Sequence, residues 1–261
     1  MLTCCATIEL NNEIEVTMGS GDFSVAEALE RVQTTIREAC EKVGRRVDEV
    51  EVIGVTKTHG PDVVREAWEA GIRIFGENKV QEAGAKIPEC MSGPEWHLIG
   101  HLQRNKAYPA LELFSVIHSV DSLRLAEQLE RVAGEAGHRP QVLLEINVSG
   151  EASKDGLRPE QAPEVIDYLM SCRSLTWTGL MTLAPFCPEP EQTRPVFAAL
   201  RELRDRWESE YGVGLPNLSM GMSNDYPIAV EEGATWLRLG TALFGNRPKW
   251  RPNAAETMGD D

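Results

Sequence analysis

The 261-residue sequence has little that points to a metal site, a disulfide-rich fold or a surface for polyanions. Its six cysteines form no CxxC pair and have no histidine cluster beside them, so we expect no zinc site and a reducing environment. A formal net charge of −15 disfavours binding to nucleic acids and to anionic membranes, because like charges repel. An apolar content of 42% is ordinary for a globular protein.

Long hydrophobic runs and linker-like segments are also missing. The opening residues MLTCCATIEL have no basic stretch and too short an apolar stretch for a signal peptide or membrane-spanning helix, so we expect a cytoplasmic protein without membrane contact. No segment rich in proline, glycine or serine divides the chain. We expect a flexible extension over residues 1–20, one domain over residues 21–248 and an irregular tail over residues 249–261.

Strand-like and helix-like segments alternate along the chain after an opening helix. A stripe of apolar residues recurs at helical spacing, and Gly44 is placed to end that helix; the stripe is Val25, Leu29, Val32, Ile36, Cys40 and Val43. Strand-like runs follow at residues 51–56, 72–76, 95–99, 115–119, 141–147, 175–181, 216–219 and 236–240. Helix-like runs lie near residues 61–70, 78–89, 103–112, 122–137, 159–172, 191–211 and 225–233.

Eight alternating repeats in this length favour an α/β fold with the parallel strands closed into a single (β/α)8 TIM barrel. The extra N-terminal helix precedes the barrel. An open doubly wound sheet is the alternative, but no GxGxxG motif follows the first strand-like run, which disfavours dinucleotide binding.

The segment VIGVTKTHG places Lys57 at the carboxyl end of the first strand-like run. A β-branched run precedes this lysine, and a Gly-Pro pair follows it. A lysine at such a junction has its stem in the core and its amine at the mouth of a pocket. Burial there lowers the pKa of an amine and frees it to form an imine with a carbonyl compound. A lysine that only reaches solvent is the alternative.

Other polar residues follow the remaining strand-like runs, and in a barrel function gathers at these carboxyl ends. Asn78 follows the second run, and Met181 ends the sixth. His97 and His101 flank the end of the third run, where a structural role is a simpler interpretation than acid–base catalysis. Lys154 lies in the loop after the fifth run and reaches either a ligand or solvent.

The last two loops carry the chemistry of a phosphate site. Gly221 and Ser223 follow the seventh strand-like run, and Gly240 and Thr241 follow the eighth. Small residues let backbone amides approach phosphate oxygens, and hydroxyls add donors, while Arg238 supplies a nearby positive charge. Either loop alone is as well explained by a turn, but barrel phosphate sites are commonly built from these two loops together.

A lysine suited to an imine and two loops suited to one phosphate indicate pyridoxal 5′-phosphate (PLP) as the cofactor. Arg238 is the basic residue available for the ring nitrogen, and no strand-end aspartate takes that position. An arginine leaves this nitrogen unprotonated, which makes the cofactor a poorer electron sink. A lysine-dependent aldolase that acts on a phosphorylated sugar also has a barrel, an imine-forming lysine and a phosphate site, and it stays an alternative.

Seven segments are similar to those of a known family and occur in its order: VTKTHG, FGENKVQEAGAKI, EWHLIGHLQRNK, INVSGEASKDG, GLMTL, LSMGMSND and RLGTALFG. Over about residues 23–247 the chain resembles the YggS/PROSC family of PLP-binding homeostasis proteins. The resemblance implies a barrel of the alanine-racemase N-terminal type with PLP bound covalently to Lys57 and close to Asn78. It also implies phosphate contacts from Ser223 and the Gly240–Thr241 loop, and a role for Lys154 in PLP exchange. His59 replaces a lysine that the family often has.

This resemblance implies a PLP carrier that serves intracellular PLP homeostasis and delivery without catalytic turnover. Related racemases and decarboxylases add a C-terminal β-domain that supplies an acid–base group, and we expect none here. The expected partners are PLP itself and apo-enzymes that require it. We expect a monomer, with a dimer left open. A PLP-dependent amino-acid racemase is the alternative function.

Overall fold

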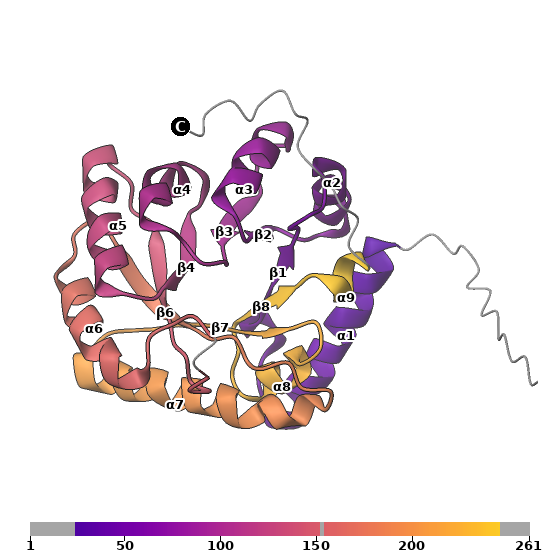
Figure 1. Cartoon of the computed structure of the whole chain (residues 1–261). Coiled ribbons are helices and arrows are strands. Elements are labelled where there is room, and N and C mark those ends of the chain that lie inside the picture. Colours follow the sequence, from indigo (N-terminus) through magenta and orange to yellow (C-terminus); the bar gives the residue numbers. More distant parts are fainter. Residues whose placement is uncertain (1–23, 152–153, 246–261) are drawn as a thin grey trace, which may run out of the picture.

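A computed structural model describes residues 24–151 and 154–245, and the expected N-terminal extension and C-terminal tail lie outside them. Parallel strands pair in sequence order and the last pairs with the first, which closes a barrel (Figure 1). The strands are β1 Glu51–Val55, β2 Ile74–Glu77, β3 Glu95–Leu98, β4 Val116–Val120, β5 Gln141–Glu145, β6 Thr176–Met181, β7 Asn217–Met222 and β8 Trp236–Leu239.

Helices surround the strands, as Figure 1 shows. The α-helices are α1 Val25–Val43, α2 Pro61–Ala70, α3 Val80–Lys86, α4 Ala107–Leu113, α5 Leu123–Ala136, α6 Ala162–Ser171, α7 Arg194–Tyr211, α8 Tyr226–Glu231 and α9 Thr241–Phe244. Short 3-10 turns are η1 Val47–Glu49, η2 Ile87–Glu89, η3 Arg104–Lys106, η4 Pro159–Gln161 and η5 Pro190–Thr193. The predicted barrel and opening helix are therefore confirmed.

Helix α1 shows why the opening pattern predicts its position. Ser24 caps the amino end by accepting a hydrogen bond from the Glu27 amide, and Gly44 ends the helix in the left-handed conformation at φ 71°. The apolar stripe of α1 is buried against the rest of the chain, and α1 contacts α8 and α9. Val43 departs from the predicted stripe, because it is 43% exposed in the last turn.

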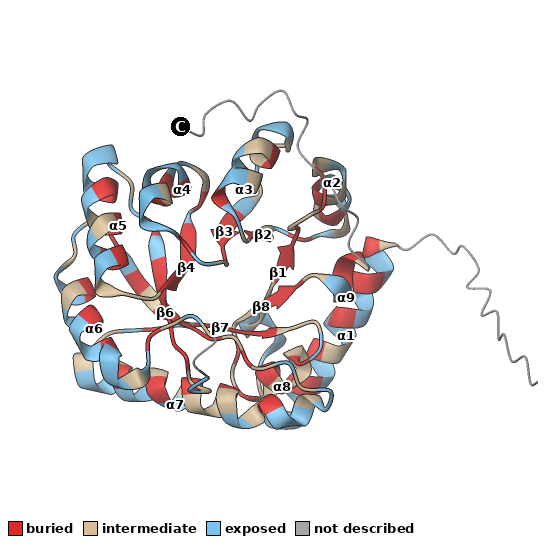
Figure 2. Cartoon of the chain, viewed as in Figure 1, coloured by how far each residue is buried: buried red, intermediate tan, exposed pale blue. Residues whose placement is uncertain are grey.

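Differences from the predicted elements occur at their ends. Strand β7 continues to Met222, beyond the predicted end at residue 219, and helix α9 was not predicted. Four residues of helix after β8 are too few to produce an apolar period, which is why α9 left no pattern in the sequence. Figure 2 shows the buried residues concentrated on the strands and on the helix faces toward them.

The barrel interior holds both apolar and polar side chains. Val116, Leu143 and Met181 form a small apolar cluster there, against which Trp236 packs. His118 is fully buried and stacks on Trp236, with 5.1 Å between the ring centroids. Buried polar side chains in a barrel core need hydrogen-bond partners, and these partners lead toward the site described below.

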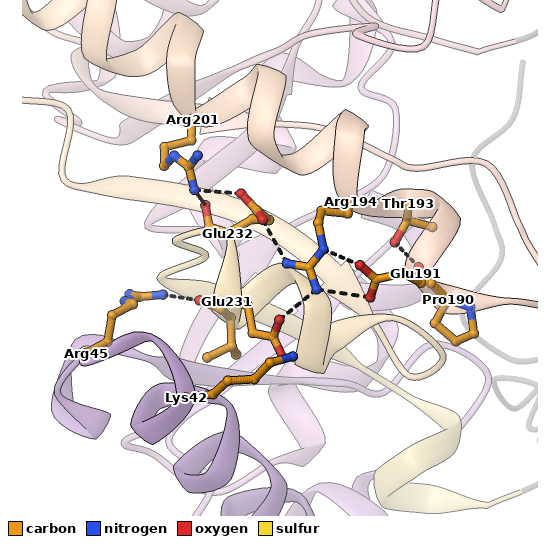
Figure 3. Close-up of polar contacts among 10 residues, drawn as sticks. Lys42, Arg45, Pro190, Glu191, Thr193, Arg194, Arg201, Glu231 and Glu232 are labelled. Atoms are coloured by element: carbon orange, nitrogen blue, oxygen red, sulfur yellow. Dashed lines mark hydrogen bonds and ion pairs between the residues drawn. The ribbon is translucent and has the colours of Figure 1, made fainter.

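On the outer wall, an ion-pair network holds the end of α8 (Figure 3). Arg194 at the start of α7 contacts Glu191, Glu231 and Glu232, and Lys42 on α1 lies 2.7 Å from Glu231 Oε1. The shared arginine and the partial burial make this network stronger than an isolated surface pair. It ties the sequence-distant α1 and α7 to α8.

Candidate functional site

A cavity of about 490 Å³ opens at the carboxyl ends of the strands. It is called the site cavity below. Its wall contains Val55, Lys57, His59, Asn78, Ile99, Gly100, His101, Glu145, Lys154, Asp155, Leu183, Ala184, Phe186, Met222, Ser223, Asn224, Arg238, Gly240 and Thr241. Segments far apart in the sequence therefore meet at one face of the barrel, which is the face where barrel proteins carry function.

Most of the residues predicted for the cofactor meet in this wall. Six line the site cavity: Lys57, Asn78, Ser223, Arg238, Gly240 and Thr241. The structure does not bring Met181 or Gly221 to the wall. Met181 is fully buried in the apolar cluster of the barrel interior. Gly221 has φ 90°, and a Cβ atom there would lie 2.6 Å from the Cβ of Ala229, so its small size serves packing against α8.

The loops after β7 and β8 are joined by a hydrogen bond. The amide of Ala242 in α9 donates to Ser223 Oγ over 3.0 Å. In the first loop, the amide of Met222 donates to Asp225 Oδ1 over 2.6 Å, which fixes the turn before α8. These contacts hold the two loops together, and Ser223, Gly240 and Thr241 from them line the same cavity.

Arg238 lines the floor of the site cavity and is almost completely buried. Its Nη1 donates to Ser219 Oγ over 2.6 Å, and its Nη2 donates to the Thr182 carbonyl over 2.8 Å. Burial lowers the pKa of Arg238 to about 10, while the negative charges of Asp225 and Glu145 oppose that shift. At neutral pH the guanidinium is therefore a fixed cation that can only donate hydrogen bonds.

A chain of hydrogen bonds, called the histidine chain below, continues from Arg238 through the barrel. Ser219 Oγ lies 2.8 Å from His118 Nδ1, and His118 Nε2 lies 3.0 Å from His97 Nδ1. His97 Nε2 lies 3.2 Å from Glu95 Oε1. Arg238 only donates and an ionised Glu95 only accepts, so both imidazoles take the neutral Nε2–H form and every bond points toward Glu95. Burial lowers the pKa of both histidines, which agrees with neutral rings.

The same fold occurs in known proteins. The family described as alanine racemase, N-terminal domain, matches residues 29–248. A protein from Aquifex aeolicus called "Pyridoxal phosphate homeostasis protein" is 42% identical over 226 residues, which cover 86% of this chain and 99% of that protein. A protein of the same name from Pseudomonas aeruginosa is 43% identical over 231 residues, which cover 88% and 98%. The chain belongs to the pyridoxal phosphate homeostasis protein family.

Solved structures agree with this assignment. PipY of Synechococcus elongatus, solved with PLP bound, matches with a TM-score of 0.75 and 39% identity over 85% of this chain and all of that chain. Alanine racemase of Clostridium difficile matches with a TM-score of 0.68 and 16% identity over 86% of this chain and 60% of that chain. At that identity the racemase shares the fold alone with this chain.

In this member of the pyridoxal phosphate homeostasis protein family, Glu145 is a cavity residue that the sequence did not reveal. The predicted fifth strand ran to residue 147, but β5 ends at Glu145, which lies buried in the wall of the site cavity. Burial raises the pKa of Glu145 to about 7, with further contributions from Asp121 and Asp155. The cavity thus contains a carboxyl group that titrates near neutral pH.

Four other residues at or near the strand ends have separate roles in the structure. Asn147 organises the loop after β5, because its Nδ2 donates to the Glu151 carbonyl over 2.8 Å and its Oδ1 accepts from the Gly150 amide over 3.0 Å. Lys154 in that loop lines the site cavity. His101 also lines the cavity, with its Nδ1 3.0 Å from Asp121 Oδ2, whereas His97 lies below it in the histidine chain.

Proposed function

We propose that this chain binds PLP in the site cavity, as a Schiff base on Lys57, and serves intracellular PLP homeostasis and delivery. The observation that carries the proposal is the convergence of Lys57 with Ser223, Arg238 and Thr241 on one cavity. A relative of 39% identity that was solved with PLP bound supports it. When bound, PLP supplies an aldehyde that reacts with amines and a phosphate that needs several hydrogen-bond donors.

The residues present fit each part of PLP. Ser223, Thr241 and the backbone at Gly240 offer hydroxyl and amide donors to a phosphate. Arg238 offers a buried cation that can donate to a ring nitrogen but cannot accept from it, so the nitrogen has to act as an acceptor. An unprotonated ring nitrogen withdraws electrons weakly, which suits a carrier better than a catalyst.

Homeostasis and delivery require that PLP enter and leave. The relatives from Aquifex aeolicus and Pseudomonas aeruginosa are both named for homeostasis, which supports a carrier over an enzyme. Lys154 lines the site cavity with Lys57 and is the residue we propose for exchange. Apo-enzymes that require PLP are the proposed recipients, and a cytoplasmic monomer is the proposed form. No helix within residues 24–151 and 154–245 is long and apolar enough to cross a membrane.

A racemase-like enzyme is the second candidate, and Glu145 is the observation that favours it. A carboxyl group with a pKa of about 7 inside the cavity is suited to proton transfer at neutral pH. Steady turnover of an amino acid by the purified protein, abolished by Glu145→Gln, would establish this second function. Release of PLP without steady turnover of an amino acid would support the carrier.

The decisive experiment is an absorption spectrum of the purified protein, followed by borohydride reduction and peptide mapping. We expect a visible band in the wild type, its loss in Lys57→Ala, and a reduced pyridoxyl adduct on Lys57. Lys42→Ala is the control, because Lys42 is an exposed lysine on the outside of α1. A colourless protein that takes up no added PLP would favour the aldolase alternative, and an adduct on another lysine would refute the site.

A further inference from the structure

The turn that carries Lys57 is attached to a charged cluster beneath it. Thr56, which precedes the lysine, is fully buried. Its amide donates to the Gly76 carbonyl over 3.2 Å, and its hydroxyl donates to Glu77 Oε1 over 2.6 Å. Its carbonyl accepts from Lys86 Nζ over 2.8 Å. Every backbone polar group of Thr56 therefore has a partner, and its carbonyl has two: the His59 amide, which donates over 3.0 Å within the turn, and the Lys86 side chain from helix α3.

Lys86 is the centre of this cluster, and its side chain is completely buried. Besides the Thr56 carbonyl, its Nζ lies 2.8 Å from Glu77 Oε1 and 3.3 Å from Glu82 Oε1. Burial of an ion pair rarely stabilises a fold more than apolar side chains of the same size would. A buried lysine that is bonded to both a carboxylate and a backbone carbonyl instead indicates that a particular geometry is being held.

The residue after Lys57 has a strained backbone. Thr58 has φ 67° and is the single non-glycine residue with positive φ within residues 24–151 and 154–245. A β-branched residue is unfavourable in this left-handed region, so surrounding contacts have to impose the conformation. The amide of Thr58 donates to Glu82 Oε1, the same carboxylate oxygen that contacts Lys86. Strain of this kind is characteristic of functional sites.

Lys57 is consequently fixed from both sides by one helix. The carbonyl before it is bound by Lys86 and the amide after it is bound by Glu82, two residues one turn apart on α3. The direction of a side chain follows from the dihedral angles of its own backbone. The two contacts set those angles where the lysine enters the wall of the site cavity.

We propose that Lys86 and Glu82 are positioning residues that hold the Thr56–Thr58 backbone so that the Lys57 amine meets its carbonyl ligand, an inference that rests on the proposed function. A purely structural role, in which the cluster only fastens α3 to the barrel, is the competing explanation. The two roles differ in one respect. A structural cluster affects stability alone, whereas a positioning cluster affects the Lys57 turn and cofactor capture beyond any loss of stability.

The test compares Glu82→Ala with a matched carboxylate elsewhere. Glu130 on α5 accepts the backbone amides of Arg173, Ser174 and Leu175, so Glu130→Ala also removes a carboxylate that anchors a loop. Glu82→Gln keeps an oxygen acceptor for the Thr58 amide and is the conservative variant. Lys86→Met is the second perturbation, and if it does not fold, the Glu82 variants decide.

Two quantities are measured for each variant. In the apo-protein, we expect amide hydrogen exchange at Thr58 to become about tenfold faster in Glu82→Ala, because a hydrogen bond to a charged acceptor is lost. In PLP uptake followed by absorbance, we expect the rate to fall about tenfold in the same variant, because a small misplacement of a reacting group is costly. Glu82→Gln should have a Thr58 exchange rate and a PLP uptake rate close to those of the wild type. Glu130→Ala should change neither rate.

The proposal is overturned if Glu82→Ala takes up PLP as fast as Glu130→Ala, or if Thr58 exchange is unchanged in Glu82→Ala. Failure of the proposed function gives a different result. In that case the wild type itself takes up no PLP, and the Thr58 exchange in the apo-protein still reports whether Glu82 holds the turn.

Discussion

Ser219→Ala is the sharpest test of the histidine chain, because Ser219 is its link to Arg238. The serine hydroxyl accepts from Arg238 Nη1 over 2.6 Å and lies 2.8 Å from His118 Nδ1. Ser219 and His118 are fully buried, so we expect no water to take the place of the hydroxyl. The substitution removes the hydroxyl oxygen. It leaves Arg238 Nη1 without its acceptor and His118 Nδ1 without its donor.

The expected loss follows from those two groups. An orphaned charged donor costs about 2 kcal/mol and a buried neutral acceptor costs about 1 kcal/mol, so Ser219→Ala should lower the free energy of unfolding by about 3 kcal/mol. The charged donor costs only about 2 kcal/mol because Arg238 Nη2 keeps its bond to the Thr182 carbonyl. Urea denaturation of the apo-protein measures the loss without any contribution from cofactor binding.

Thr178→Val is the matched control. The Thr178 hydroxyl is buried with no hydrogen-bond partner within the described residues, so replacing it by a methyl group should be neutral or stabilising. A loss below about 1 kcal/mol in Ser219→Ala would refute the chain as a set of real hydrogen bonds. An equal loss in both variants would show that removing any buried hydroxyl has the same effect here.

Three further predictions concern the cavity and its surroundings. The pKa of Glu145 is raised from 4.5 to about 7, so its contribution to stability is full below pH 4.5 and is lost as the pH rises to about 7. In urea titrations at pH 5 and pH 8, the free energy of unfolding should fall less between the two pH values in Glu145→Gln than in the wild type, by up to about 3 kcal/mol. An unchanged pH dependence would contradict the assignment. Arg238→Gln should speed cofactor loss on dialysis, and unchanged retention would exclude Arg238 as a ligand contact. Gly221→Ala should lower the free energy of unfolding by about 2 kcal/mol with PLP retention unchanged, because a Cβ atom there meets Ala229 at 2.6 Å. A Gly221→Ala variant that is as stable as the wild type but loses PLP would instead support the predicted contact between Gly221 and the cofactor.

The barrel was predictable because its signals are local and repeated. Apolar runs of strand length alternate with amphipathic segments, and eight such repeats fit one closed sheet. The positions of Lys57 and Arg238 followed from the same reasoning, since Lys57 closely follows β1 and Arg238 lies near the carboxyl end of β8. Exact boundaries did not follow, because the ends of elements depend on tertiary contacts that the sequence pattern does not show.

The residues that sequence reasoning missed are polar ones that point inward. Lys86 falls in a helix-like run where a lysine is ordinarily solvated, yet it is fully buried. His118 falls in a strand whose residues are all buried, so alternation gave no indication of its partners. Glu145 was hidden because β5 ends two residues earlier than predicted. In each case the missing information is a contact between residues distant in the sequence.

The two residues proposed to contact opposite ends of the cofactor's ring, Lys57 and Arg238, are both held by buried polar networks in place of apolar packing. Such networks are less stabilising than a barrel core filled with branched apolar layers. They do have a directional property that apolar packing lacks, because removing one member leaves specific groups unsatisfied. An open cavity of about 490 Å³ cannot be shaped by side chains packed against each other across it. Its wall residues have to be held from below, and hydrogen bonds to Lys86 and Ser219 do that for the turn at Lys57 and for Arg238.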